Sequence, residues 1–316
     1  APLVQAGVAR LCLRPTGIGS SLQSAVSMSA SKKNTLQAWL FLAPALLLLL
    51  AFSFWPVGFG SYLAFTQYNL IDAPVWVGLD NFRELFADEL FISSLKNSAL
   101  YLLVVPAIQV LAILLAVLVN NQLPGIKFYR AAYYLPVVTT VSVIGVIWNF
   151  MYTDDGALNA VLRWLHVINE PIGWLSDDRI ALFAVMFVTI WRGLGWYMVL
   201  YLAGLQSVPQ DVYEAAVLDG ANAWQRFWKI TVPLLMPTIL LCSVMSMLAA
   251  VKCFEEVQIM TKGGPMQSTY TALFYAYEFG IKSLNFGRAL AASLVMSVFC
   301  VALAWLNFRY LQPRKK

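Results

Sequence analysis

Charged residues are scarce in this chain. Lys, Arg, Asp and Glu make up 12% of its 316 residues, whereas hydrophobic residues make up 60%. An ordinary soluble domain has about twice that share of charge, so the composition excludes this class. The net charge is nevertheless +5. We attribute this positive excess to an anionic membrane surface, and we expect no nucleic-acid partner.

Cysteine and histidine are scarce as well. The four cysteines form no C-x-x-C pair, and Cys242, Cys253 and Cys300 fall within apolar runs. We interpret them as small apolar residues. His166 is the only histidine and has no partner at ligand spacing, so we interpret it as a solvated loop residue. Because no nucleophile–base pair or metal cluster is visible, we expect no catalytic residue and no metal site.

A phosphate-binding loop of the Gly-x-x-x-x-Gly-Lys-Ser/Thr type is also missing. The most similar stretch, GIGSS at 17–21, has no lysine. The chain therefore has no recognisable means of holding the phosphates of ATP. If ATP drives its function, a partner has to bind the nucleotide.

Long apolar runs are abundant. Runs of about 20 apolar residues can cross a hydrocarbon core of about 30 Å. We predict six such spans, at roughly 38–60, 97–119, 131–152, 180–205, 233–254 and 289–311. Strands of a membrane barrel would alternate in hydropathy, and LLLLLAFSF at 46–54 does not. The sequence therefore predicts an all-α membrane protein with six transmembrane helices.

The distribution of basic residues predicts the orientation. If the N-terminus lies inside, twelve Lys and Arg residues fall on the inner side and seven on the outer side. Basic residues near the ends of spans favour the cytoplasm, so we expect both termini there. Residues 1–35 are predicted to be a disordered cytoplasmic tail. Residues 1–27 lack the apolar run of a signal peptide, and an upstream, non-native start before Met28 is one explanation for them.

The segment 206–232, between the fourth and fifth spans, is polar and rich in small residues. Ser207 and Gln210 have the spacing of a capping box, which predicts a helix that starts at Ser207. Gly220 tolerates a positive φ and is expected to end or turn this helix. A plain connecting loop explains these features. It does not explain the small-residue face around Ala215 and Ala216, which is typical of a helix that docks into a groove of another protein.

The pattern EAA-x-x-DGA-x-x-W-x-x-F-x-x-I-x-x-P-x-x-x-P closely resembles the EAA loop of permease subunits of binding-protein-dependent ABC importers. The matching residues are Glu214, Ala215, Ala216, Asp219, Gly220, Ala221, Trp224, Phe227, Ile230, Pro233 and Pro237. Two other stretches, VGLDNF at 77–82 and TKGGP at 261–265, resemble the carbohydrate-uptake branch of these importers. The resemblance covers essentially everything after Met28.

This resemblance implies the type I ABC importer (MetI-like) permease fold for residues 36–316, in the cell (inner) membrane. It implies four further partners, namely a second related permease, two cytoplasmic ATPase subunits that hold ATP and Mg, and an extracytoplasmic solute-binding protein. No cofactor is expected on this chain itself. The segment 206–232 would be the cytoplasmic coupling loop, with Glu214 facing a basic residue of the ATPase. The implied coupling residues are Glu214, Ala215, Ala216, Asp219, Gly220 and Ala221.

Arg192 lies about halfway along the fourth span, where a charge costs roughly 2.5–3.5 kcal/mol. Two interpretations stay open: Arg192 lines the solute pathway, or it forms a structural pair between helices. Lys252 can extend to the membrane surface, and we favour that interpretation over a pathway role. The candidate pathway residues are Arg192, Trp191, Tyr197, Asn149 and Lys252.

The sequence therefore favours the transmembrane subunit of an ATP-driven sugar importer. Glycerol-3-phosphate or another small polar solute is the alternative, since Arg192 suits an anion. An ion-coupled secondary carrier is a different class and usually needs carboxylates within the membrane. The acidic residues that we place on the inner side, Asp211, Glu214 and Asp219, all lie in a loop.

Overall fold

The structure is a computed structural model that describes residue 35, residues 37–120 and residues 125–311. The predictions about residues 1–27, and nearly all of the predicted tail 1–35, lie outside the described residues. The chain divides into two compact units, one that ends at Phe59 and one that begins at Gly60. The first contains the π-helical turn η1 (Leu50–Phe54), and α2 (Trp55–Leu63) begins within it.

Within the described ranges, five helices are long and apolar enough to cross a membrane. They are Gln37–Leu63, Glu89–Val119, Ala181–Gln206, Met236–Met260 and Phe286–Arg309. The remaining predicted span, 131–152, consists of two helices, Phe128–Val138 and Val141–Met151, that are bent by 101°. The prediction of an all-α membrane protein is confirmed. The span predicted at 131–152 is a bent pair of helices, and the described residues contain six spans if this pair counts as one.

The bend lies between α6 (Ile126–Val138) and α7 (Val141–Met151). Thr139 and Thr140 are both extended there, with ψ of 137° and 145°. Pro136 is inside α6 and has no N–H to donate, which weakens the last turn of this helix. The Thr139 hydroxyl donates to the Leu135 carbonyl at 3.1 Å, a local bond that competes with continued helix.

The other elements of the second unit are mostly helical. Strands β1 (Thr66–Gln67) and β2 (Val75–Trp76) pair antiparallel, with Thr66 opposite Trp76. The helices before α6 are α3 (Asp80–Ala87), α4 (Glu89–Tyr101) and α5 (Val104–Val119). Those after α7 are α8 (Ala157–Trp164), α9 (Ala181–Gln206), α10 (Gln210–Leu218), α11 (Ala223–Arg226), η2 (Phe227–Thr231), α12 (Val232–Leu234), α13 (Met236–Val251), α14 (Glu255–Met260), α15 (Ala272–Tyr277), η3 (Glu278–Lys282) and α16 (Phe286–Leu311).

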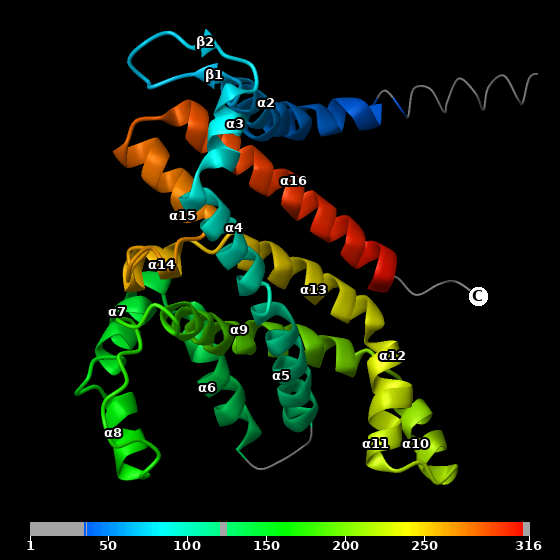
Figure 1. Ribbon diagram of the computed structural model, residues 1–316. Helices are drawn as coiled ribbons and strands as arrows, with labels where there is room; N and C mark the ends of the chain where they lie inside the picture. The colour runs from blue at the N-terminus through cyan, green and yellow to red at the C-terminus, as the bar shows by residue number, and fades with distance from the viewer. Residues whose placement is uncertain (1–34, 36, 121–124, 312–316) are drawn as a thin grey trace, which may run out of the picture. The chain divides into compact units, whose positions relative to one another are not determined.

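The larger hydrophobic core surrounds α9, which packs along α5 and crosses α6 (Figure 1). Gly195 is the contact point with α6, because a Cβ atom there would overlap the carbonyl oxygen of Tyr133. Small residues allow helices in membranes to approach closely. Since α9 runs unbroken from Ala181 to Gln206, its glycines serve close packing rather than a kink.

A second hydrophobic core joins α3, α4, α15 and α16. Arg288 forms an ion pair with Asp88, and its guanidinium lies 4.5 Å from the ring centre of Phe279. The Tyr275 hydroxyl donates to the same Asp88 carboxylate at 2.7 Å. Burial, and then this hydrogen bond, raise the pKa of Tyr275, so its hydroxyl stays protonated.

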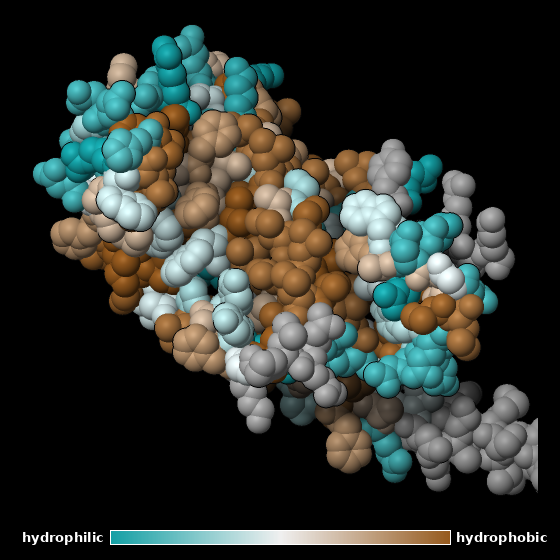
Figure 2. Space-filling view, turned by 90° about the horizontal axis from the view of Figure 1, so that it is seen from below, coloured by the Kyte–Doolittle hydropathy of each residue, from teal (hydrophilic) through white to brown (hydrophobic). Residues whose placement is uncertain are grey.

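Hydrophobic side chains, drawn in brown, cover much of the face shown in Figure 2, and hydrophilic ones gather toward its margins. Large side chains such as Leu114, Leu135 and Phe183 are exposed on the second unit. A soluble protein rarely exposes so large a continuous apolar surface, so this surface suits lipid.

Candidate functional site

The predicted coupling loop folds as two short helices, α10 and α11, separated by a tight turn (Figure 1). Gly220 has a φ of +78°, as predicted for the turn residue. The Ala221 N–H donates to the Ala216 carbonyl at 2.9 Å, and the Gly220 N–H donates to the Val217 carbonyl at 3.0 Å. These two bonds form a Schellman motif, which requires a left-handed residue after the helix.

The start of α10 differs from the prediction. This helix begins at Gln210 after Pro209 and has no side-chain cap. Ser207 instead keeps helical angles at the end of α9, so its hydroxyl points back and donates to the Gly204 carbonyl at 2.7 Å. The prediction of a capping box at Ser207 is therefore wrong. A capping box is present at α11, where Asn222 and Gln225 bond reciprocally at 2.8 and 3.0 Å.

The coupling residues present an open face. Glu214, Ala215, Asp219 and Gly220 are exposed, Ala221 is half-buried and Ala216 is buried. None of the ion pairs between described residues includes either acidic residue of this group. The polar loop therefore offers two exposed carboxylates and small side chains for contact with another chain.

A cavity of about 1080 Å³ lies between this loop and the ends of α5, α6 and α9, and we call it the loop cavity. Its wall includes Glu214 from α10, Arg226 from α11 and Arg130 from α6. The Tyr213 and Thr231 hydroxyl groups lie 3.1 Å apart beside it and join α10 to η2. The coupling loop therefore contacts the membrane helices of its own chain, with the loop cavity between them.

Arg192 forms an ion pair across two helices. Its Nη2 atom lies 3.0 Å from Oε1 of Glu256, on α14. Glu256 is 8% exposed, and the Arg192 side chain is 32% exposed. The Cys253 thiol donates to the second carboxylate oxygen at 3.7 Å. The sequence did not reveal Glu256 as the partner, because the predicted fifth span ended at 254 whereas the helical segment continues to Met260.

The other candidate pathway residues are divided. Asn149 donates to the Ile259 carbonyl at 3.3 Å, so Asn149 and Arg192 both contact α14. The Trp191 ring packs edge-on against the Trp148 ring, with 5.4 Å between the ring centres. Tyr197 is buried within the larger core, and Lys252 is exposed at the end of α13. Arg192 on α9 and Asn149 on α7 therefore both contact α14, whereas no hydrogen bond or ion pair among the described residues joins Tyr197 or Lys252 to α14.

A buried row of polar side chains joins four helices of the second unit. The Gln109 amide donates to the Ser246 hydroxyl at 2.7 Å and accepts from the Tyr201 hydroxyl. The Asn307 amide donates to Ser243 at 2.5 Å, and the Ser246 hydroxyl donates to the Ser243 carbonyl at 3.1 Å. Hydropathy along one sequence cannot pair residues so far apart, which is why this row was not predicted.

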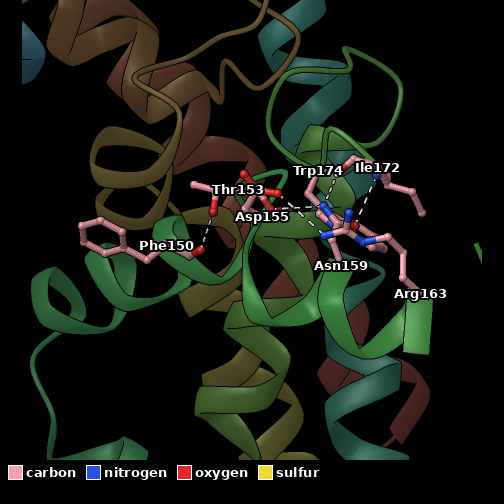
Figure 3. A network of polar contacts seen from close by, with 7 residues as sticks. All are labelled: Phe150, Thr153, Asp155, Asn159, Arg163, Ile172 and Trp174. Carbon is pink, nitrogen blue, oxygen red and sulfur yellow. Dashed lines mark hydrogen bonds and ion pairs between the residues drawn. The ribbon is translucent and has the colours of Figure 1, made fainter. Parts of the chain in front are cut away.

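The loop 153–179 is built around Asn159 on α8 (Figure 3). Its amide donates to the carbonyls of Thr153 and Ile172 at 3.1 and 3.0 Å. Its oxygen accepts from the Ile172 N–H at 3.2 Å and from the Trp174 indole at 3.0 Å. His166 in the same loop is exposed with a φ of 56°, which agrees with the interpretation as a solvated loop residue.

Replacing Asn159 by leucine is expected to destabilise this loop. Asn159 is fully buried, so the substitution leaves several buried donors and acceptors unpaired, each at a cost of about 1–3 kcal/mol. We expect a lower temperature of thermal unfolding and faster proteolysis within 153–179. Asn169→Leu is the control, because Asn169 is exposed in the same loop. Equal proteolysis of both variants would contradict the role of Asn159.

Residues 94–316 match the family described as binding-protein-dependent transport system inner membrane component. The probable ABC transporter permease protein YesP of Bacillus subtilis (strain 168) is 35% identical over 283 residues, covering 88% of this chain and 91% of that protein. The lactose transport system permease protein LacF of Rhizobium radiobacter is 31% identical over 304 residues, covering 91% of this chain and 98% of that protein.

A solved structure agrees with the fold. A chain in the crystal structure of a bacterial ABC transporter involved in the import of the acidic polysaccharide alginate matches with a TM-score of 0.78 at 24% identity. The match covers 92% of this chain and all of that chain. The predicted ABC importer permease fold is therefore confirmed. The chain is an integral membrane protein and belongs to the family of binding-protein-dependent transport system inner membrane components.

Proposed function

We propose that the chain is the transmembrane permease subunit of an ATP-driven importer that takes up a sugar. A second related permease, two cytoplasmic ATPase subunits and an extracytoplasmic binding protein complete the transporter. The chain lies in the cell (inner) membrane with both termini in the cytoplasm. ATP and Mg are held by the ATPase subunits, and this chain has no ATPase site and no cofactor of its own.

The coupling loop is the observation that carries this proposal. The chain has the family's membrane helices, and it also has an exposed, small-residue helix hairpin between two of them. This hairpin also exposes large apolar side chains, Leu218 and Trp224 among them, and such a surface is typical of one that another chain covers. We propose that Glu214 and Asp219 face the ATPase and that Ala215, Ala216 and Ala221 allow close contact. Gly220 forms the turn between the two helices.

Transport in this scheme is a population shift between two states of the pathway. ATP brings the ATPase subunits together, α10 and α11 move with them, and the pathway changes from inward-facing to outward-facing. A ligand or partner shifts such an equilibrium only by its different affinity for the two states. The pair Arg192–Glu256 joins α9 to α14 in the state described here, and we propose that α9 and α14 border the pathway.

The substrate class follows from relatives rather than from a described pocket. LacF is a lactose transport system permease protein, which supports a saccharide. Glycerol-3-phosphate or another small polar solute is the alternative, supported by the sn-glycerol-3-phosphate transport system permease protein UgpA of Agrobacterium fabrum, which is 31% identical. The charge of Arg192 no longer favours it, because Glu256 pairs with that charge. The test is ATP hydrolysis by the purified transporter in proteoliposomes with its binding protein and one candidate solute at a time. We expect a sugar to stimulate ATP hydrolysis. Stimulation by glycerol-3-phosphate and by no sugar would contradict the assignment of a sugar as the solute.

An ion-coupled secondary carrier is a second candidate, because Glu256 is a buried carboxylate within a helical segment that can span the membrane. Such carboxylates often bind protons or sodium. Glu256, however, forms an ion pair with Arg192, which favours a carboxylate that stays charged over one that binds and releases a proton. An assay of solute uptake by the chain alone in liposomes, under a proton or sodium gradient, distinguishes a secondary carrier from an importer subunit. We expect no uptake, and gradient-driven uptake without ATPase subunits would contradict the importer.

A further inference from the structure

The loop cavity has an excess of positive charge in its wall. Its charged side chains are Arg130, Arg226 and Glu214. Two guanidinium groups and one carboxylate leave one net positive charge. Across the described ranges, none of these three side chains takes part in an ion pair. Arg130 and Arg226 are half-buried, whereas Glu214 is exposed. A partly buried charge without a counter-charge is costly, so the two arginines favour an anionic ligand.

The two arginines keep unused hydrogen-bond donors. The Nη2 atom of Arg130 donates to the Val119 carbonyl at 2.8 Å, which fixes this guanidinium at the end of α5. The Nε atoms of Arg130 and Arg226 are buried and have no hydrogen-bond partner among the described residues, so a ligand in the cavity would meet the terminal Nη groups of these side chains. Arginine presents five N–H donors in a planar fork, and this fork matches the oxygens of a phosphate group.

The rest of the wall is mixed. Its apolar part includes Val117 from α5, Leu205 from α9 and Phe227 from η2. Its uncharged polar residues are Asn120, Gln206, Gln210, Tyr213 and Thr231. Its volume of about 1080 Å³ is far more than one phosphate group fills. The ligand therefore needs an anionic group and an apolar part. A phospholipid has both, and its phosphodiester carries one negative charge, whereas a phosphomonoester carries about 1.5 to 2 at pH 7.

We propose that the loop cavity binds the phosphodiester group of a phospholipid. Arg130 and Arg226 contact the phosphate oxygens, and the acyl chains lie along the wall that contains Val117, Leu205 and Phe227. The proposal rests on the membrane setting of the proposed function, but it does not depend on the transported solute. A bound lipid would join α10 and α11 to the ends of α5, α6 and α9, and would stiffen the coupling loop.

The experiment titrates the complete, delipidated transporter in detergent, with native mass spectrometry as the measurement. Phosphatidylglycerol, zwitterionic phosphatidylcholine and soluble sn-glycero-3-phosphoglycerol, a phosphodiester head group without acyl chains, are the probes. We expect phosphatidylglycerol to bind at least about tenfold more tightly than the soluble phosphodiester, because burial of acyl chains adds affinity. We also expect it to bind more tightly than phosphatidylcholine, which has no net negative charge. Binding of the soluble phosphodiester as tight as that of phosphatidylglycerol would overturn the lipid assignment.

Substitutions of residues in the cavity wall test whether the lipid binds in the loop cavity. The double variant Arg130→Gln/Arg226→Gln is expected to bind phosphatidylglycerol at least about tenfold more weakly, because charge-assisted hydrogen bonds are lost. Ala223→Trp is expected to weaken binding by filling the cavity while both guanidinium groups remain. Lys229→Gln is the control, since Lys229 is an exposed basic residue of η2 outside the wall. Unchanged binding in the double variant, or an equal loss in Lys229→Gln, would overturn the proposal.

Discussion

Replacing Glu214 by lysine is expected to abolish transport while leaving the permease in the membrane. Glu214 is exposed on α10 and has no ion-pair partner among the described residues, so the substitution breaks no ion pair there. Across the proposed interface it opposes a basic residue of the ATPase. A like-charge contact there costs several kcal/mol, which corresponds to a loss of at least about a hundredfold in coupled ATP hydrolysis. Solute-stimulated ATP hydrolysis in proteoliposomes is the measurement.

A charge reversal elsewhere on the same helix provides the control. Asp211 is also exposed on α10, but it lies outside the matched coupling residues. Asp211→Lys is expected to stay within about fivefold of the parent, since it loses only a favourable interaction with the helix dipole. Equal hydrolysis by the parent and Glu214→Lys would contradict the proposed contact with the ATPase.

Gly220 offers an independent variant of the same loop. A side chain at this position meets no atom within 4 Å, so only the φ of +78° opposes a substitution. Gly220→Val is expected to uncouple hydrolysis from transport, because a β-branched residue strains a turn with positive φ. Gly220→Asn is expected to be milder, since asparagine tolerates the left-handed region.

Breaking the pair Arg192–Glu256 is the second prediction with a large effect. Removal of one partner from a buried ion pair costs about 3–5 kcal/mol, and the partial exposure of Arg192 lowers this to about 2–4 kcal/mol. Arg192→Gln is expected to be the more severe change, because it leaves the buried Glu256 carboxylate without a counter-charge. Glu256→Gln leaves a guanidinium whose side chain is 32% exposed, and in the proposed arrangement this exposed part faces the aqueous pathway. Thermal unfolding and transport are measured for both variants.

The double variant Arg192→Gln/Glu256→Gln separates structure from function. Without either charge, no buried carboxylate is unpaired, so thermal stability is expected to return toward that of the parent. Transport is expected to stay low if α9 and α14 border the pathway. Full transport by the stable double variant would show that the pair serves packing alone. Arg192→Gln as stable as the parent would contradict the pair itself.

Much of the fold was predictable because a bilayer imposes simple requirements on the sequence. Apolar runs of the required length predicted the helical segments at 37–63, 89–119, 181–206, 236–260 and 286–309 within a few residues for most ends. The bend between α6 and α7 was not predicted, because the apolar run continues on both sides of Thr139 and Thr140. Backbone angles at two polar residues decide that bend, and composition does not report them.

The coupling loop was predictable for a different reason. The need for a left-handed residue identified Gly220, since glycine adopts that conformation without strain. The start of α10 was mispredicted because Ser207 was free to bond backward to Gly204. The partner of Arg192 was missed since Glu256 lies beyond the apolar run that defined the fifth span. Pairings between distant helices, such as Gln109 with Ser246, depend on packing that one sequence does not reveal.

The most direct test of the central claim is a photocrosslinking experiment on the complete transporter. A photoreactive amino acid replaces Ala215, an exposed residue of α10, and Trp164, an exposed residue of α8, serves as the comparison site. We predict that Ala215 crosslinks to the ATPase subunit and that Trp164 does not. An adduct of Ala215 with the binding protein, or no adduct of Ala215 with any subunit, would contradict the account.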